Sequence, residues 1–396
     1  MHSNADTANQ HEPLRFEGEP PVRWTGKALD ELLVWMVERK GSDIKLDPGQ
    51  PVWMRLHGEW LPVTRRDLNN SEIAALLDET SRDRSASSRV GSGDDLDFAH
   101  EVAIDRTQRL RYRVNATGCS DGWASGMELT FRAIPAHPPT IQELGLEREI
   151  IEAAVEQPGL VLVAGRTGSG KSTLLAALLR YVNESYPMSI ATFEDPVEFR
   201  LTGLKGRKGP VAQSQIGIHF DKFVRATRNS TRRAEDVILL GESRDLETVK
   251  QMIELADTGP RIYSTIHTQS AAETPGRIIR MFPSGEQNKI ASDLMQCLRL
   301  IVYQQLMGIV DPDTGRNIGR VAVREYLPIT RSLRRQLEQA RLSEYGRIIE
   351  QAMADGLGRD LLTHAAQLHA QGHINDEQLH QLRRARGAHG EVADVA

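Results

Sequence analysis

The sequence has little of what marks secreted, zinc-binding or membrane-spanning proteins. It contains only two cysteines, Cys119 and Cys297, which provide neither a disulfide framework nor a thiolate metal site. No apolar run is long enough to cross a bilayer, and residues 1–19 lack the apolar core of a signal peptide. We therefore expect a cytoplasmic protein whose association with a membrane is peripheral and made through a partner.

The sequence also lacks a strong charge of either sign. Its formal net charge is −5 at pH 7, so it has no overall electrostatic footprint for nucleic acid. A hydrophobic content of 39% and a charged content of 26% are ordinary for a soluble globular protein. The length of 396 residues fits two or three domains, at roughly 150 residues each.

What the sequence does contain is a phosphate-binding loop pattern. The pattern is formed by Gly165, Arg166, Thr167, Gly168, Ser169, Gly170, Lys171, Ser172 and Thr173. An apolar run at 160–164 precedes it as a buried parallel strand, and helix formers follow at 172–180. The glycines let backbone N–H groups converge, and the helix N-terminus adds positive potential. A glycine-rich turn that binds nothing is the alternative, and the order of strand, loop, Lys-Ser and helix disfavours it.

Three further apolar strands end in polar residues. Residues 189–193 end in Glu194 and Asp195, residues 236–240 lead to Glu242, and residues 261–266 end in His267. Helical stretches separate these strands, which predicts a parallel sheet with right-handed crossovers. Because ligands bind beyond the carboxyl ends of such strands, we expect all these side chains at the same edge as Lys171.

The residues at this edge suit ATP hydrolysis, which needs a cation, a positioned water and positive charge at the γ-phosphate. Lys171 would reach the β- and γ-phosphates. One of Glu194 and Glu242 would be the general base and the other would order the Mg²⁺ shell; solvated strand-end carboxylates are the alternative. The oxygen ligands expected around Mg²⁺ belong to Ser172, Glu194, Asp195 and Glu242. His267 would either sense the γ-phosphate or brace the strand end. The guanine-selecting Asn-Lys-x-Asp pattern is absent, so ATP is the expected nucleotide.

The N-terminal half predicts a mixed α and β domain. Residues 1–24 are polar and are expected to be disordered, and residues 81–95 are expected to form a loop. In the predicted hairpin, Arg109, Arg111 and Arg113 alternate with apolar residues, so the three guanidinium groups share one face. Arg132 lies on the next strand. A solvated sheet face is the ordinary explanation, and contact with phosphate is the other.

The remaining segments complete the outline. Residues 136–140 contain Pro138 and Pro139 and predict a semi-rigid linker. Residues 141–157 are expected to be helical, and so is the tail from 331 onward. Four tail histidines, His364, His369, His373 and His380, are interpreted as surface residues, because Gly372 interrupts the only pair at helical spacing.

Several of these segments together resemble the sequence boxes of one family, the secretion and pilus-retraction ATPases (PilT/GspE-like, traffic ATPases). Residues 194–198, Glu-Asp-Pro-Val-Glu, resemble its acidic box, and 236–248 its second nucleotide-binding box. Residues 264–268 resemble its histidine box, and 277–283 are similar to the helix that follows. Ser42-Asp43-Ile44, residues 111–115 and 131–135 also fit. The resemblance covers roughly residues 24–328.

The resemblance implies an α/β fold with a RecA-like P-loop ATPase domain at 141–330. It implies a smaller PAS-like α+β domain at 25–135, a linker at 136–140 and C-terminal helices at 331–396. It further implies a homo-hexameric ring in which Arg113 and Arg132 reach nucleotide phosphates. Glu242 takes the role of catalytic glutamate with Glu194 as its partner. Arg228 and Arg232 match the arginine-bearing helix before the second box.

The sequence departs from the family at three places. Pro260 stands where a histidine is usual, Gln213-Ser214-Gln215 replaces Gln-Arg-Glu, and Ala234-Glu235-Asp236 replaces Asp-Pro-Asp. None of these changes touches the phosphate loop or the strand-end carboxylates. The C-terminal helices and the absence of a cysteine-rich zinc module resemble the type IVB secretion or conjugation branch, with the type IV pilus retraction ATPases as the alternative.

The resemblance implies a hexameric motor that serves a secretion, conjugation or pilus machine, with inner-membrane platform proteins as partners. Nucleic acid is not expected as a direct ligand. The rivals are a RecA-like nucleic-acid motor, a P-loop small-molecule kinase and a scaffold that binds ATP without hydrolysing it.

Overall fold

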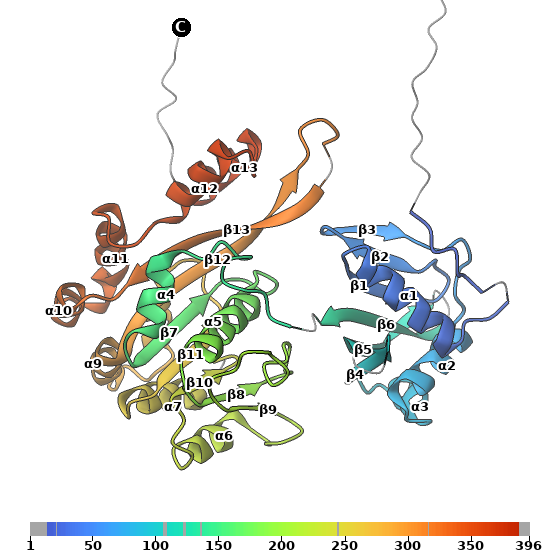
Figure 1. Ribbon diagram of the computed structural model, residues 1–396, viewed down its shortest axis with the longest axis horizontal. Helices are drawn as coiled ribbons and strands as arrows, with labels where there is room; N and C mark the ends of the chain where they lie inside the picture. Colours follow the sequence, from blue (N-terminus) through green and yellow to red (C-terminus); the bar gives the residue numbers. More distant parts are fainter. Residues whose placement is uncertain are drawn as a thin grey trace, which may run out of the picture. The chain divides into compact units, whose positions relative to one another are not determined.

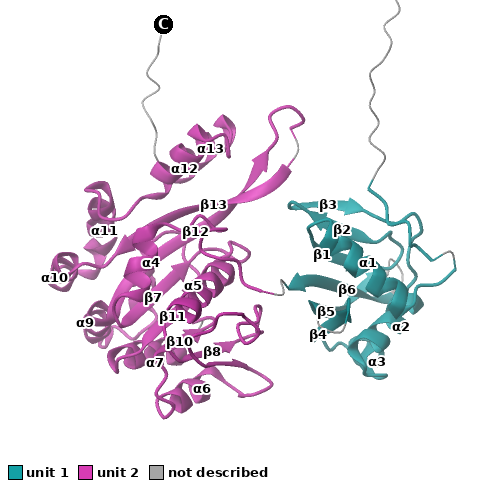
Figure 2. Cartoon of the chain, in the orientation of Figure 1, with its two compact units in different colours: residues 1–136 teal, residues 137–396 magenta. Residues whose placement is uncertain are grey.

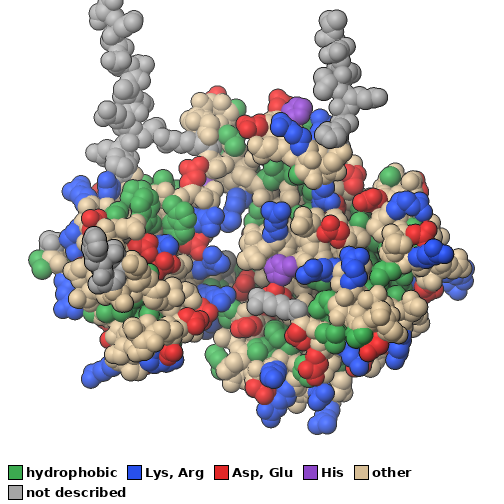
Figure 3. Space-filling model, turned by 180° about the vertical axis from the view of Figure 1, so that it is seen from behind, with side chains coloured by type: hydrophobic (Ala, Val, Ile, Leu, Met, Phe, Trp, Pro, Cys, Tyr) green, Lys and Arg blue, Asp and Glu red, His purple; other side chains and the backbone are tan. Residues whose placement is uncertain are grey.

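The computed structural model describes residues 14–20, 22–105, 109–121, 124–134, 137–243, 245–315 and 317–387. The chain separates into two compact units, residues 1–136 and residues 137–396 (Figure 2). On the face drawn in Figure 3, basic and acidic side chains of the described residues are interspersed on each unit.

The first unit is a six-stranded antiparallel sheet with three helices (Figure 1). Its elements are α1 (Gly26–Glu38), β1 (Gly41–Leu46), β2 (Trp53–Leu56), β3 (Glu59–Pro62), α2 (Asn70–Ser81), α3 (Ala86–Gly91), β4 (Leu96–Ala103), β5 (Arg109–Asp121) and β6 (Ala124–Ile134). The sheet order is β3-β2-β1-β6-β5-β4. Helix α1 begins after its N-cap Thr25 and buries Leu29, Leu32, Leu33 and Met36 at helical spacing against the sheet.

The second unit is built on a seven-stranded sheet in the order β13-β12-β7-β11-β10-β8-β9. Its strands are β7 (Gly159–Ala164), β8 (Ile190–Glu194), β9 (Val211–Gln215), β10 (Val237–Leu240), β11 (Arg261–Ile266), β12 (Leu298–Val310) and β13 (Asn317–Pro328). Every neighbouring pair is parallel except the β12–β13 hairpin. This confirms the predicted α/β class.

Helices cover both faces of this sheet, and successive strand residues point to opposite faces. Leu160 and Leu162 of β7 join the core cluster that includes α7, α9 and the C-terminal helices. Val161 and Val163 join the cluster formed with α4 and α5. The helices of this unit are α4 (Arg148–Val155), α5 (Lys171–Ser185), α6 (Phe223–Ser230), α7 (Leu246–Asp257), α8 (Glu273–Arg280), α9 (Gln287–Cys297), α10 (Arg331–Gln339), the 3-10 helix η1 (Leu342–Glu344), α11 (Tyr345–Ala354), α12 (Leu361–Ala370) and α13 (Asp376–Ala385).

Three local predictions were wrong. Part of the segment 1–24, which was expected to be disordered, packs on the first unit. Phe16 is buried there, and its ring stacks on that of Trp24. The expected loop at 81–95 contains α3, which buries Val90. The helix expected at 141–157 is shorter, since turns occupy 141–145 before α4.

Candidate active site

The phosphate loop spans residues 165–170 between β7 and α5, and its shape depends on glycine. Gly165, Gly168 and Gly170 have φ values of 147°, 77° and 85°, which side chains rarely tolerate. A Cβ on Gly165 would lie 2.4 Å from the backbone oxygen of Gln304. A Cβ on Gly170 would lie 2.7 Å from Gln304 Nε2. The glycines are therefore required both by the turn and by the close approach of Gln304.

The loop presents donors at the start of α5. Gly170 is the N-cap and supplies no side-chain hydrogen bond, so the first-turn N–H groups are left for an anion. Lys171 is buried, and its Nζ donates to the backbone oxygens of Gly165 and Arg166 at 2.9 and 3.0 Å. The buried Ser169 hydroxyl has no hydrogen-bond partner within the described residues. These features fit a nucleotide phosphate group.

The other predicted loop residues differ in exposure. Arg166 and Thr167 are exposed, whereas Ser172 and Thr173 are half-buried in the first turn of α5. The Ser172 hydroxyl therefore lies on the element that also carries Lys171, where an Mg²⁺ ligand is expected.

The strand ends meet at one edge of the sheet, as predicted. Ala164 of β7 pairs with Ile266 of β11, and Gly165 N donates to the Ile266 oxygen at 3.3 Å. Leu240 of β10 pairs with Ser264 of β11 and with Phe193 of β8. His267, Glu242 and Glu194 therefore follow neighbouring strands at the edge that holds the phosphate loop.

Glu242 and His267 are in direct contact. His267 Nε2 lies 2.8 Å from Glu242 Oε1, and the two side chains are 40% and 22% exposed. The histidine therefore lies against one carboxylate oxygen at the edge of the sheet. The γ-phosphate sensor role of His267 remains a prediction, and its contact with Glu242 is also what the bracing alternative expects.

Glu194 is the more deeply placed carboxylate. It is 8% exposed, and burial raises its pKa to about 7. Gln213 Nε2 lies 3.4 Å from Glu194 Oε1. A carboxyl group that titrates near neutral pH suits proton transfer. Neighbouring Asp195 is exposed.

The expected Mg²⁺ ligands do not form a ready-made cage. Within the described residues, no three His, Cys, Asp or Glu side chains come together as a metal site. Mg²⁺ in nucleotide sites is held by one or two carboxylates together with substrate phosphates. The Mg²⁺ roles of Ser172, Glu194, Asp195 and Glu242 therefore stay a prediction, in which the nucleotide would supply the remaining ligands.

Two predicted arginines lie on the first unit. Arg113 of β5 pairs in register with Arg132 of β6, so both lie on one face of the sheet. Arg113 Nη2 is 3.4 Å from Asp97 Oδ2, and Arg132 Nε is 2.7 Å from Asp43 Oδ1. Both arginine side chains remain partly exposed, at 42% and 59%. The period-two prediction for this strand is confirmed.

Comparison with known proteins decides the family. The family described as type II/IV secretion system protein matches residues 101–387. The chain belongs to this secretion ATPase family. Over 317 residues it is 32% identical to the type IV pilus retractation ATPase PilT of Pseudomonas aeruginosa. The aligned residues cover 80% of this chain and 87% of that protein.

Solved structures agree with this placement. The ATPase DotB of Legionella pneumophila superposes with a TM-score of 0.86 at 31% identity, covering 94% of this chain and 100% of that one. The pilus retraction motor PilT with bound ADP superposes with a TM-score of 0.69 at 27% identity, covering 89% and 96%. The protein is therefore an ATPase, as predicted, and a nucleotide is its cofactor.

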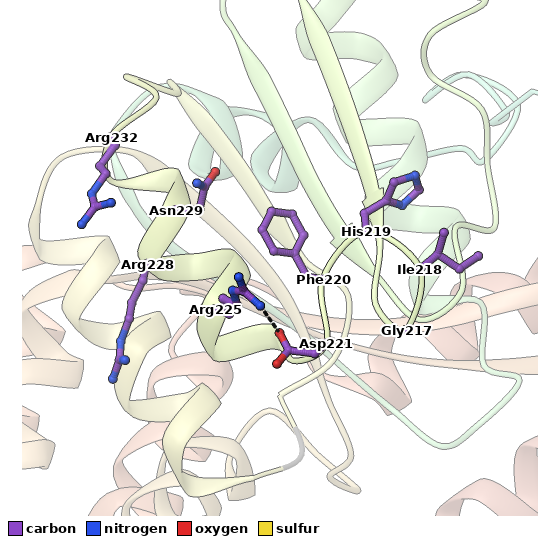
Figure 4. Close-up of a pocket in the computed structure, with 9 residues that line it drawn as sticks. All are labelled: Gly217, Ile218, His219, Phe220, Asp221, Arg225, Arg228, Asn229 and Arg232. Atoms are coloured by element: carbon purple, nitrogen blue, oxygen red, sulfur yellow. Dashed lines mark ion pairs between the residues drawn. The ribbon is translucent and has the colours of Figure 1, made fainter.

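A separate cavity of about 590 Å³ lies on the second unit of this secretion ATPase (Figure 4). Arg225, Arg228 and Arg232 line it from α6 and the turn after it, and Arg225 pairs with Asp221 at 3.5 Å. None of its lining residues belongs to the phosphate loop or to the strand-end carboxylates. The arginine-bearing helix therefore lines a hollow formed by the segment that follows β9, which is parallel to β8 and pairs with it at Glu194.

Two buried polar residues next to the phosphate loop were not predicted from the sequence. Gln304 and Arg324 are 3% exposed and lie opposite each other on β12 and β13. Gln213 was treated only as a departure from the family, yet it contacts Glu194. One of the histidines interpreted as surface residues, His364, is in fact buried. The signal that could have found Gln304 is a polar residue that follows the apolar run 300–303.

Proposed function

We propose that this ATPase is the subunit of a homo-hexameric ring motor that couples ATP hydrolysis to a type IV secretion or conjugative-transfer machine of the type IVB-like branch. The observation that carries the proposal is the common edge of the phosphate loop, Glu242, His267 and Glu194. The greater structural similarity to DotB than to PilT supports this branch. Type IV pilus retraction is the second candidate, favoured by the sequence identity to PilT.

In the proposed reaction the phosphate loop and Lys171 hold the nucleotide phosphates. Glu242 acts as the catalytic glutamate that orients the attacking water, and Glu194 is its partner. Ser172, Asp195 and the two glutamates are the candidate ligands for Mg²⁺, which would neutralise phosphate charge when bound. His267 holds Glu242 in place.

Arg113 and Arg132 are proposed to contact the nucleotide phosphates, with motion about the linker at Pro138 and Pro139 changing that contact during the cycle. Their cross-strand pairing supports the proposal. Like charges opposite each other are unfavourable, and an anion would relieve the repulsion.

We further propose that the motor works in the cytoplasm, bound through platform proteins to the inner membrane. Within the described residues, no helix is long and apolar enough to cross a membrane. On the face drawn in Figure 3, the interspersed charges offer little to a nucleic-acid backbone.

Light scattering after size-exclusion chromatography, with and without ATP, tests the ring. We expect a particle about six times the 44.2 kDa mass of the chain when ATP is present. A monomer that hydrolyses ATP at full rate contradicts the ring and favours a small-molecule kinase. Strong stimulation of hydrolysis by DNA, falling steeply with salt, favours the nucleic-acid motor.

A further inference from the structure

A series of buried hydrogen bonds connects the phosphate loop with the C-terminal helix α12. Gln304 Nε2 donates to the backbone oxygen of Ser169 at 2.6 Å. Gln304 Oε1 accepts from Arg324 Nε at 2.7 Å. The backbone N–H of Arg324 donates to His364 Nδ1 of α12 at 3.0 Å. Ser169, Gln304, Arg324 and His364 are all buried.

The carboxylate of Glu147 lies beside the Arg324 guanidinium in this series of hydrogen bonds. Arg324 Nη1 lies 3.5 Å from Glu147 Oε2, and Arg324 Nη2 donates to the backbone oxygen of Leu144 at 3.0 Å. Glu147 also pairs with Arg359, which precedes α12, and lies 3.9 Å from His364 Nε2. The guanidinium of Arg324 is thus held on several sides, which leaves Gln304 little freedom to turn.

The position of Gln304 determines how the loop presents a donor. The peptide unit is planar and trans, so its C=O and N–H point in opposite directions. Holding the Ser169 oxygen toward Gln304 therefore directs the Gly170 N–H away from β12. Gly170 in turn has no room for a Cβ, because Gln304 Nε2 would lie 2.7 Å from it.

We propose that Gln304 is a positioning residue of the phosphate loop, and that Arg324 and Glu147 couple the docking of α12 to the affinity of the loop for the phosphates of a nucleoside diphosphate or triphosphate. The proposal rests on the ATPase reaction and adds a route by which the C-terminal helices control it. A partner that displaced α12 would take His364 from the backbone N–H of Arg324 and Arg359 from Glu147, which would loosen the support of Arg324 and Gln304 and weaken the binding of the nucleotide.

The first experiment compares Gln304→Met with Gln305→Met in the full-length chain. Gln305 is the next residue of β12, with its side chain on the other face near Tyr303. A fluorescent ADP analogue reports the dissociation constant, and thermal unfolding without nucleotide reports the fold. We expect ADP to bind about tenfold more weakly to Gln304→Met and within twofold of normal to Gln305→Met. A purely structural role predicts a lower unfolding temperature with unchanged ADP affinity, and that result overturns the proposal.

The second experiment tests the coupling through His364→Phe, which leaves the loop untouched even if Gln304→Met folds poorly. We expect about threefold weaker ADP binding in the otherwise normal chain and no further loss in the Gln304→Met background. Equal losses in both backgrounds, or no loss at all, overturn the coupling. If the unaltered chain binds no ADP, the nucleotide site itself fails; if it binds and Gln304→Met binds equally, only the role of Gln304 fails.

Discussion

Arg113 and Arg132 face each other across strands β5 and β6, and each is paired with its own aspartate. Two guanidinium groups in directly opposed positions repel, and Asp97 and Asp43 offset that repulsion in the first unit. The aspartates leave both arginines partly exposed, so their remaining donors are available to a phosphate. The proposed contact with phosphate depends on these donors, and a solvated sheet face stays the alternative.

Removing either arginine should slow hydrolysis. Arg113→Ala and Arg132→Ala are expected to lower kcat by roughly 100-fold, since an arginine that stabilises transition-state charge contributes at least that much. Phosphate release measures the rate, and light scattering checks assembly. Arg111→Ala is the control, because Arg111 shares the strand face but its side chain is only 17% exposed, against 42% for Arg113; it should stay within about twofold. An assembled Arg113→Ala protein with the normal rate would show that this face is only solvated.

Glu242→Gln should separate binding from chemistry. The amide keeps the size of the side chain and its place beside His267 but cannot take a proton, so kcat is expected to fall by about 10²–10⁴ while ADP binding persists. Glu247→Gln is the matched control, since Glu247 is 62% exposed on α7. Undiminished hydrolysis by Glu242→Gln would show that Glu242 is not the catalytic glutamate, and a wild-type chain that binds ATP without hydrolysing it would favour the scaffold.

The parts of the site that the sequence predicted follow from local rules. Strand period two placed Arg111 and Arg113 on one face, opposite buried Tyr112 and Val114. Parallel-sheet topology brought Glu194 and Glu242 to the edge of the phosphate loop. The first rule needs only the neighbouring residues, and the second needs only the order of strands and helices along the sequence. A single sequence was therefore enough to predict these parts of the site.

The parts that it did not predict depend on contacts between distant segments. Gln304 meets Ser169 across 135 positions of sequence, and no local pattern encodes that distance. Phe16 lies in a polar segment, so its burial is visible only once Trp24 and Trp35 are placed beside it. His364 shares the buried face of α12 with Leu361, Ala365 and Leu368, and its contact with Arg324 of β13 joins segments 40 positions apart.

The aromatic contacts of Phe16 should stabilise the first unit. Phe16 is 7% exposed, and its ring centroid lies 5.6 Å from that of Trp35. Phe16→Ala is expected to lower the free energy of unfolding by roughly 3 kcal/mol, measured by urea denaturation with tryptophan fluorescence. Val22→Ala is the control, since Val22 is 83% exposed. A change below about 0.5 kcal/mol would mean that the segment does not stay packed in solution.

Stability of the second unit should fall in mild acid through His364. Burial, followed by the charge of Arg359 and, less strongly, that of Arg324, lowers the pKa of His364 to about 4, while the charge of Glu147 opposes the shift. Between about pH 6.5 and pH 4 the unfolded chain binds a proton that the folded chain does not, so stability decreases as the pH falls.

We expect this linkage to remove about 2 kcal/mol between pH 7 and pH 4.5 relative to His364→Gln, after allowing for partial solvent screening. The raised pKa of Glu194 acts in the opposite direction over this range, equally in both proteins. Urea denaturation at the two pH values measures the linkage in the unaltered chain and in His364→Gln, which cannot titrate. His380→Gln is the matched control, because His380 is exposed on α13. The pH-dependent loss should shrink in His364→Gln alone; an equal loss in all three proteins would place the titrating group elsewhere.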